Sequence, residues 1–188
     1  MIIWLEGPDG SGKSTLKDSI YDTLTEGKYN TNKVDANGEL LIPTHPARDG
    51  RLNEQQLFKQ LKKMVLSDCV YIVDRGPISD CIYRVFDNYK PVTTLNKVIN
   101  FIKHYNNKIF LCYCRTDVAE EKMLERGDEN PVALTRHKEL TRLYDMVMGL
   151  ISVNCPYNFR KYDFTKKRSI NELLGQISYF VYMNGGLN

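Results

Sequence analysis

The sequence predicts a three-layer α/β domain in which a five-stranded parallel sheet is flanked by helices, and three observations support this fold class. The chain has 188 residues, of which 42% are hydrophobic and 26% are charged, a balance that suits one domain with a sizeable core. Short apolar runs alternate with segments of helical periodicity. Glycine and proline residues fall between these segments and do not gather in a linker. We therefore expect a single domain over residues 1–188, with strands joined by right-handed crossovers.

The expected strands are short, apolar and separated by helices. The first is Ile2–Glu6, and residues 69–73 form a continuous apolar run that ends at Asp74. The polar stretch 27–39, rich in Asn and Gly, is expected to be a loop before the second strand. The strands are expected at residues 2–6, 40–42, 69–73, 108–113 and 159–163.

The expected helices have apolar residues at helical spacing and recognisable ends. Such spacing is clear in the segment 54–66. Thr94 is a suitable N-cap for a helix that runs through Tyr105. Residues 127–131 begin with Gly and end with Pro, and they should separate two helices. The helices are expected at residues 14–24, 54–66, from about 78 onward, 94–105, 118–126, 132–151 and 170–183.

A glycine-rich loop between the first strand and the first helix has the spacing G-x-x-x-x-G-K-[ST]. In this strand-loop-helix context, backbone N–H groups turn inward around phosphate oxygens, and Lys13 reaches the terminal phosphates. The hydroxyl of Ser14 can bind Mg²⁺. The loop therefore predicts a P-loop fold that binds the phosphates of ATP. The expected ATP-binding residues of the loop are Gly7, Asp9, Gly10, Ser11, Gly12, Lys13, Ser14 and Thr15.

Asp74 ends an apolar strand and directly precedes Arg75. A carboxylate at this position can bind Mg²⁺, directly or through water, beside Ser14. The alternative is an aspartate that only caps a helix or stabilises a turn. Because an unpaired charge is costly at the end of a buried strand, the metal site is favoured. Ser14 and Asp74 are the predicted metal ligands.

Two motifs resemble those of the thymidylate kinase family, and weaker similarity extends over nearly the whole chain. The segment 7–15, GPDGSGKST, is similar to that family's phosphate loop, which has an Asp between its first glycines. The segment 74–83, DRGPISDCIY, is similar to the family's D-R-Y-x-x-S-x-x-A-Y. The segment 57–62, LFKQLK, is a weaker match to an L-F-x-x-x-R helix, and residues 123–127 with 142–144 are a weaker match to the lid region.

The resemblance implies a site shared by two nucleotides, with Mg²⁺ and with ATP as the phosphoryl donor. Arg75 would bind the acceptor monophosphate, Asp9 would lie near the acceptor sugar, and Phe58 would stack on the acceptor base. Arg126 would contribute to ATP binding from a lid at about residues 125–136. A homodimer is also implied. The acceptor-binding residues expected on this basis are Asp9, Arg48, Arg51, Phe58, Lys62, Arg75, Ser79, Asp80 and Tyr83.

Three departures from the family pattern concern the acceptor base. Gly76 replaces a Tyr, Lys62 stands where an Arg would meet the base, and Asp80 stands where a neutral polar residue is common. An aspartate near the base could accept hydrogen bonds from an exocyclic amine. Cytosine, adenine and guanine therefore stay open beside thymine, as does a permissive pocket.

The arginine that stabilises the transition state must lie outside the phosphate loop, because positions 8–11 contain none. Arg126, Arg136 and Arg142 are the candidates, and each could equally be a solvated charge on a helix face. The predicted catalytic residues are Lys13, Arg75, Asp9, Arg126, Arg136 and Arg142.

Proton chemistry favours a phosphate as the acceptor. A nucleoside monophosphate already has an ionised attacking oxygen at neutral pH, because its second pKa is about 6. A nucleoside or a 5′-hydroxyl nucleic acid end needs a general base, and the segment 43–46, PTHP, where related nucleoside kinases carry one, has no carboxylate. Phosphate contacts on this loop would fall to Arg48 or Arg51. Asp49 nearby keeps a deoxynucleoside kinase or a polynucleotide 5′-hydroxyl kinase open as alternatives.

Composition and charge argue against other classes. The net charge of +3, from 26 basic and 23 acidic residues, does not indicate a nucleic acid or a membrane as partner. No apolar run approaches the roughly 20 residues of a membrane-spanning helix. A strand begins at residue 2 and leaves no room for a signal peptide, so we expect a cytoplasmic location, in the host cytoplasm if the source is viral. A nucleotide-dependent switch should contain a motif such as N-K-x-D, which this sequence lacks.

Overall fold

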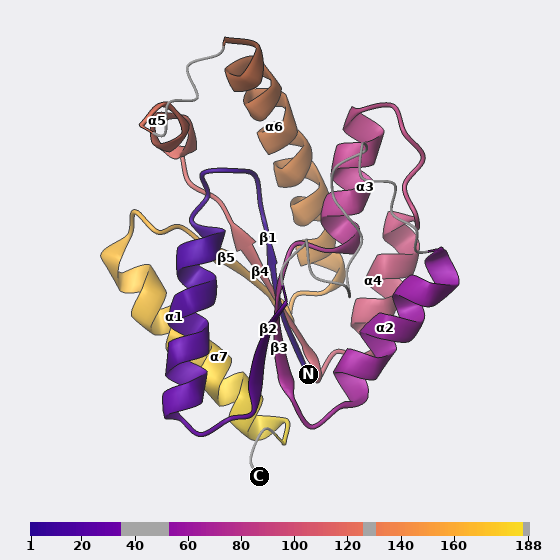
Figure 1. The fold of residues 1–188 in the computed structure, drawn as a ribbon, viewed down its shortest axis with the longest axis vertical. Coiled ribbons are helices and arrows are strands. Elements are labelled where there is room, and N and C mark those ends of the chain that lie inside the picture. The colour runs from indigo at the N-terminus through magenta and orange to yellow at the C-terminus, as the bar shows by residue number, and fades with distance from the viewer. Residues whose placement is uncertain (35–52, 126–130, 186–188) are drawn as a thin grey trace.

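The computed structural model describes residues 1–34, 53–125 and 131–185, and it has the predicted layers of helices around a parallel sheet (Figure 1). The sheet has five strands in the order β2-β3-β1-β4-β5. The strands are β1 Ile2–Glu6, β2 Thr31–Val34, β3 Val70–Asp74, β4 Ile109–Cys114 and β5 Phe159–Tyr162. The helices are α1 Lys13–Glu26, α2 Glu54–Leu66, α3 Pro77–Phe86, α4 Leu95–His104, α5 Ala119–Leu124, α6 Pro131–Asn154 and α7 Lys167–Met183.

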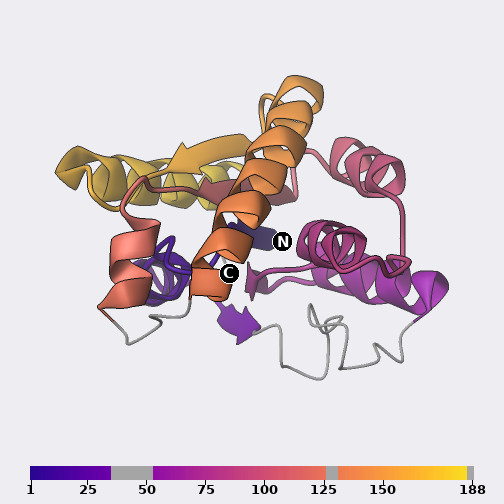
Figure 2. The same ribbon diagram turned by 90° about the horizontal axis from the view of Figure 1, so that it is seen from above.

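Side chains of β1 alternate between two hydrophobic cores, one on each face of the sheet. Ile2 and Trp4 pack in the core formed with α2, α3, α4 and α6. Ile3 and Leu5 pack in the core formed with α1 and α7. Every residue of β1 is buried, as expected for the central strand of a parallel sheet that is covered on both faces. Seen from above, α6 lies between α5 and the group of α2, α3 and α4 (Figure 2).

Most predicted elements are present within a few residues of their expected bounds. The predicted bounds of α2 are those observed. Thr94 caps α4, since its side chain accepts a hydrogen bond from the N–H of Lys97 at 3.4 Å. α7 begins at Lys167, three residues before the predicted start. Residues 126–130 of the predicted lid lie outside the described residues, and residues 131–136 form the start of α6.

A strand forms within the stretch 27–39, where the sequence predicts a loop. β2 spans Thr31–Val34, inside the stretch expected to be a loop, and residues 40–42 lie outside the described residues. β2 is an edge strand paired in parallel with β3, with Thr31 opposite Val70 and Val34 opposite Val73. Backbone pairing with β3 stabilises such a strand even though three of the four residues of its sequence, TNKV, are polar.

All strands are parallel, so their carboxyl ends meet at one edge of the sheet, where ligands bind in α/β folds of this kind. The phosphate loop leaves β1 at this edge, and Asp74 and Arg75 leave β3 beside it. None of the described helices combines the length and the apolar composition that a membrane crossing requires.

Candidate active site

The phosphate loop leaves β1 at the centre of the sheet and leads directly into α1. Gly7 has a φ of 150°, and a Cβ added there would lie 2.2 Å from the carbonyl oxygen of Cys114 at the end of β4. Only glycine therefore allows the loop to turn this close to β4. Because α1 begins at Lys13, the free N–H groups of its first turn border the loop. The loop and the helix start together form an anion-binding corner.

Lys13 is buried, and its ammonium group lies over its own loop. Nζ donates to the carbonyl oxygen of Pro8 at 2.6 Å and to Oγ of Ser11 at 3.3 Å. Burial, followed by repulsion from Arg75, lowers the pKa of Lys13 to about 8. A bound phosphate could replace the carbonyl of Pro8 as the partner of this ammonium group and would favour its charged form.

Arg75 follows β3 and reaches the phosphate loop. Its guanidinium donates to the carboxylate of Asp9 and lies over the ring of Tyr83, 5.2 Å from the centroid. Burial alone would lower the pKa of Arg75, but Tyr144, Tyr83 and Asp9 together raise it, so the side chain stays charged. The backbone of Arg75 is left-handed, with a φ of 67°, a strained conformation that is frequent at functional sites.

Asp9 connects the phosphate loop to two other parts of the chain. Its carboxylate binds Arg75, and its backbone carbonyl oxygen lies 3.0 Å from Nε2 of His137 in α6. Because a carbonyl only accepts, Nε2 carries the hydrogen in this contact. Burial would raise the pKa of Asp9, but the charges of Arg75 and Lys13 outweigh burial and lower it. Asp9 is therefore ionised at neutral pH and is a weak base.

The predicted Mg²⁺ ligands are Asp74, the last residue of β3, and Ser14, in the first turn of α1. One carboxylate oxygen of Asp74 lies 3.7 Å from Nζ of Lys17, and the other is buried without a hydrogen-bond partner in the described part of the chain. Ser14 and Lys17 are one helical turn apart, so the face of α1 that carries Ser14 is turned toward Asp74. One carboxylate and one hydroxyl fit Mg²⁺, which takes its other ligands from water and phosphate. The structural alternative is the ion pair with Lys17 alone.

Glu6 is the last residue of β1 and is completely buried. One of its oxygens accepts a hydrogen bond from Oγ of Ser79 in α3, and Oγ of Ser79 lies 2.7 Å from the hydroxyl of Tyr144 in α6. Burial raises the pKa of Glu6 to about 7, although Ser79, Arg75 and Lys13 each act to lower it. A titratable carboxyl group therefore lies directly under the phosphate loop.

Glu6 and His137 carry no motif in the sequence, and Tyr144 falls only in the weak match to the lid region. Glu6 does have a signal, since it is an acidic residue at the end of an apolar strand, as Asp74 is. His137 has no local signal, because its partner in the phosphate loop lies 128 residues away in the sequence. Tyr144 likewise meets Ser79 across 65 residues.

Phe58 and Lys62 lie in a groove between α2 and α4. The ring of Phe58 packs against that of Phe101 in α4, with centroids 5.5 Å apart. The groove has a volume of about 420 Å³, and its lining also includes Lys97 and Tyr105 but no residue of the phosphate loop. The structure thus brings Phe58 and Lys62 together but does not bring them to Arg75, and their role in binding the acceptor base stays a prediction.

Asp80 is fully buried, and both of its oxygens are occupied. One accepts a hydrogen bond from Nε of Arg84 at 2.6 Å and the other from the N–H of Val92 at 2.8 Å. Burial raises the pKa of Asp80, while these two contacts act to lower it. The carboxylate therefore connects α3 to the segment that follows it, and it has no exposed surface at which to meet an acceptor base.

Gly76 departs from the family motif for a reason that the structure makes clear. A Cβ added at Gly76 would lie 2.7 Å from Cζ2 and 2.8 Å from Nε1 of Trp4. The indole of Trp4 in β1 occupies the space that a side chain at position 76 would need. The aromatic group at this point comes from β1 and not from the start of α3.

The structure describes two of the three candidate transition-state arginines, Arg136 and Arg142, and shows neither in contact with the phosphate loop among the described residues. Arg136 is ion-paired with Asp87 at the end of α3 and lies over the ring of Phe86, 4.8 Å from the centroid. Arg142 lines a cavity of about 200 Å³ between α6 and the segment after β4. The other arginines predicted for the site, Arg48, Arg51 and Arg126, lie outside the described residues.

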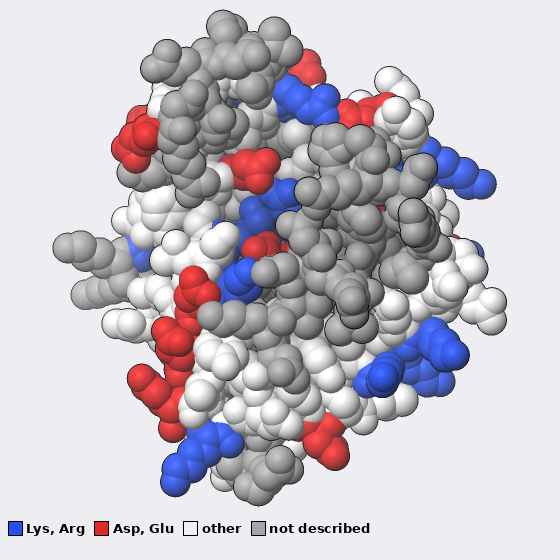
Figure 3. All heavy atoms as spheres, in the orientation of Figure 1, with Lys and Arg blue, Asp and Glu red and all other residues white. Residues whose placement is uncertain are grey.

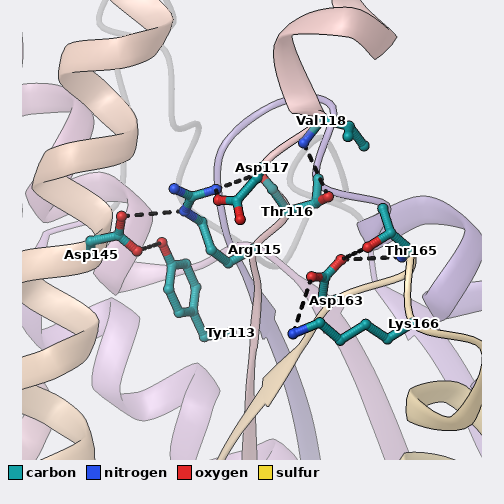
Figure 4. A network of polar contacts seen from close by, with 9 residues as sticks. All are labelled: Tyr113, Arg115, Thr116, Asp117, Val118, Asp145, Asp163, Thr165 and Lys166. Carbon is teal, nitrogen blue, oxygen red and sulfur yellow. Dashed lines mark hydrogen bonds and ion pairs between the residues drawn. The ribbon is translucent and has the colours of Figure 1, made fainter.

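Polar contacts hold α6 against the end of β4 beside this cavity (Figure 4). Asp145 of α6 accepts hydrogen bonds from the hydroxyl of Tyr113 at 2.7 Å and from Nε of Arg115 at 3.2 Å. Arg115 also pairs with Asp117 at 2.9 Å. At the end of β5, Asp163 accepts hydrogen bonds from Thr165. The two contacts of Asp145 position α6, and with it His137, relative to the end of β4.

Comparison with known proteins finds likeness only at the level of structure. No protein-family model and no curated protein sequence matches the chain. The YorR protein of Bacillus subtilis, solved in complex with phosphorylated GDP, is 25% identical with a TM-score of 0.65, over 100% of this chain and 99% of that chain. Deoxyadenosine kinase of M. mycoides, solved with dATP and with the products dCMP and dCDP, is 19% and 20% identical, with TM-scores of 0.57 and 0.56. Each of these two comparisons covers 95% of this chain and 100% of the other. With its phosphate loop and its parallel sheet, the chain has the fold of the P-loop nucleotide kinases.

Proposed function

We propose that the chain is a Mg²⁺-dependent nucleoside monophosphate kinase that transfers the terminal phosphoryl group of ATP to a deoxynucleoside monophosphate, either dTMP or a broader range. The observation that carries this proposal is the position of Arg75, a permanent cation that β3 and Asp9 hold at the phosphate loop. It lies close enough to act on Lys13 electrostatically. Two cations at one loop suit a reaction that brings two phosphate groups together.

Each residue has a role that follows from its chemistry. Lys13 would bind the terminal phosphates of ATP, and Arg75 would bind the phosphate of the acceptor. Ser14 and Asp74 would hold Mg²⁺, which when bound neutralises phosphate charge. Asp9 orients Arg75 through their ion pair. Catalysis of this kind depends on positioning and on charge stabilisation more than on covalent chemistry.

The pKa of Asp9 supports a phosphate over an alcohol as the acceptor. A nucleoside would need a general base at its 5′-hydroxyl, and the carboxylate of Asp9 is a weak base because Arg75 and Lys13 lower its pKa. An ionised monophosphate needs no such base.

The solved structures support nucleotides as the ligands and keep one alternative open. YorR was solved with phosphorylated GDP, and deoxyadenosine kinase with dATP, dCMP and dCDP. A deoxynucleoside kinase is therefore the second candidate, with Asp49 as its base, although Asp49 lies outside the described residues. A polynucleotide 5′-hydroxyl kinase is less favoured: among the described residues on the face shown in Figure 3, basic and acidic side chains are interspersed and form no broad basic band.

The experiment that tests the proposal is ADP release from Mg-ATP with a panel of acceptors. The panel contains the four deoxynucleoside monophosphates and dUMP, the matching nucleosides and a 5′-hydroxyl oligonucleotide. Turnover confined to monophosphates is the expected result. Turnover only with nucleosides or with the oligonucleotide would contradict the proposal and would direct attention to Asp49.

The family resemblance also implies a homodimer, and we extend the proposal to that assembly in the cytoplasm. Light scattering coupled to size-exclusion chromatography measures the mass directly. A mass near the 21.8 kDa of one chain would contradict the dimer without affecting the proposed reaction.

A further inference from the structure

Glu6 ends β1 immediately before the phosphate loop, and its carboxyl group has no access to solvent. One oxygen accepts a hydrogen bond from Ser79, and the other has no hydrogen-bond partner among the residues that the structure describes. A buried carboxylate with an unpartnered oxygen is energetically costly, whereas the protonated acid is far less so. The enclosure of this group therefore favours the protonated form.

The elements packed around Glu6 contribute both cations and hydroxyl groups. Lys13 and Arg75 are the positive charges that act on it, and both lower its pKa against the effect of burial. The titratable and polar groups that face or act on Glu6 are Lys13 of α1, Arg75 after β3, Ser79, Cys81 and Tyr83 of α3, and Tyr144 of α6. Glu6 can thus stay ionised only with help from the two cations assigned above to the phosphates.

We propose that Glu6 is a positioning residue whose protonation is linked to phosphate binding: when anionic phosphate groups bind at Lys13 and Arg75, Glu6 takes up one proton from solvent. The phosphate oxygens neutralise the two cations, so the stabilisation of the Glu6 carboxylate is lost while its burial remains. The linkage is reciprocal, and a protonated Glu6 strengthens phosphate binding by the same factor. The inference rests on the proposed roles of Lys13 and Arg75, but not on the identity of the acceptor.

Proton uptake would reverse the chain of hydroxyl groups that leads away from Glu6. In the ionised form, Ser79 donates to Glu6 and the hydroxyl of Tyr144 donates to Ser79, over 2.7 Å between the two oxygens. In the protonated form, Glu6 can donate to Ser79, and Ser79 can donate to Tyr144. The hydrogen of Tyr144 is then free to turn toward the hydroxyl of Tyr83, whose ring lies edge-on to that of Tyr144 with centroids 6.1 Å apart. Because the ring of Tyr83 lies under Arg75, the proton at Glu6 acts on the environment of that guanidinium.

Trp4 provides a built-in reporter for the test. It is the only tryptophan of the chain, it is buried, and it lies on the same face of β1 as Glu6, two residues away. We would follow its fluorescence from about pH 5 to about pH 9, the range in which a group with a near-neutral pKa titrates, with and without sodium sulfate. Sulfate mimics a phosphate group but does not titrate in this range, so any proton taken up belongs to the protein.

The wild-type chain is expected to show a transition near the pKa of Glu6, about 7, and sulfate is expected to move its midpoint to higher pH. Glu6→Gln should lose the transition near pH 7, because an amide keeps the shape but cannot ionise, and should keep only a transition near pH 8 from Lys13. Glu139→Gln, the same substitution at an exposed position of α6, should keep both the transition and its shift. His137→Gln should also keep the transition and its shift with sulfate. This result would exclude His137, which contacts the phosphate loop, as the source of the transition.

A transition near pH 7 that persists in Glu6→Gln, or a wild-type midpoint near pH 7 that sulfate does not move, would overturn the proposal. If Glu6→Gln does not fold, infrared difference spectra of the wild-type chain give the answer without a variant. Added sulfate should then produce the band of a protonated carboxylic acid, and the absence of that band would overturn the proposal. An error in the acceptor assignment would leave the sulfate effect intact, so the two proposals fail independently.

Discussion

Lys13 is hydrogen-bonded to its own loop, and burial lowers its pKa to about 8. We expect Lys13→Ala to lower kcat/KM by about 10²–10³-fold, or roughly 3–4 kcal/mol, because it removes a preorganised charge from the transition state. The melting temperature should change little, since the substitution also removes an amine that is desolvated on folding. Steady-state kinetics and calorimetry measure both effects. Lys63→Ala, at an exposed position of α2, is the control, and wild-type turnover by Lys13→Ala would argue against the assigned role.

The environment of Asp80 favours a structural role, as the buried partner of Arg84, over a role in binding the acceptor base. Its oxygens already accept hydrogen bonds from Arg84 and Val92, and Arg84 is itself largely buried. We expect Asp80→Asn to destabilise the fold by about 2–4 kcal/mol, because it leaves a buried guanidinium without its counter-charge, and to leave the order of preference among bases unchanged. Urea unfolding and the acceptor panel test the two parts. Asp22→Asn, at an exposed position of α1, is the control. An altered base preference at full stability would place Asp80 in the base site instead.

At the scale of elements, β1 and α3 meet at the contact between Trp4 and Gly76. Gly76→Ala should destabilise the fold by about 1–3 kcal/mol, because the added methyl group would overlap the indole. Trp4→Phe in the same chain should recover part of that loss, and a double-mutant cycle measures the coupling. Gly149→Ala in α6 is the matched control, since nothing lies within 4 Å of the added methyl group there. It should be neutral or should stabilise the helix by about 0.5–1 kcal/mol. Equal effects at the two glycines would rule out the steric explanation.

The elements also show where sequence patterns stop being informative. The bounds of α2 were predictable because apolar residues recur along it and because Asn53 and Gln56 form a capping box at its start. β2 was not predictable, because an edge strand of four residues has little apolar periodicity and owes its existence to pairing with β3. The pairing partner of such a strand lies far away in the sequence, so local composition favours a loop.

At the scale of the whole molecule, Glu6 makes stability depend on pH. Its pKa rises from 4.5 in the unfolded chain to about 7 in the folded one, mainly through burial. Its contribution to stability is therefore fully present below pH 4.5 and is lost as the pH rises through about 7, a loss of about 3 kcal/mol. Glu6→Gln should lack this loss, so its stability relative to wild type should increase between about pH 5 and about pH 8. Urea unfolding of both chains at about pH 5 and about pH 8 measures the difference in their free energies of unfolding. The same difference at both pH values would show that Glu6 does not titrate between them.

The fold class and the phosphate loop were predictable because both depend on local spacing, as does the placement of Asp74 and Arg75 at the end of β3. The hydrogen bonds of Glu6 with Ser79 and of Ser79 with Tyr144 were not, since they join residues 73 and 65 positions apart. Periodicity predicts that each of the three elements is buried, but it does not predict which polar side chains face one another. The orientation of α6 decides which polar side chains face one another, and this orientation depends on packing across the whole domain.

Because Asp9 already pairs with Arg75, an acceptor phosphate can bind Arg75 at the proposed acceptor site only in exchange for this carboxylate. An incoming phosphate cannot simply add to a free cation, because it has to displace a carboxylate that is tethered to the phosphate loop. A small anion such as inorganic phosphate gains little from this exchange, whereas a nucleotide brings a sugar and a base whose further contacts can tip the balance. Inorganic phosphate would then bind weakly at the acceptor site, and the enzyme would not transfer the phosphoryl group of ATP to it to form pyrophosphate.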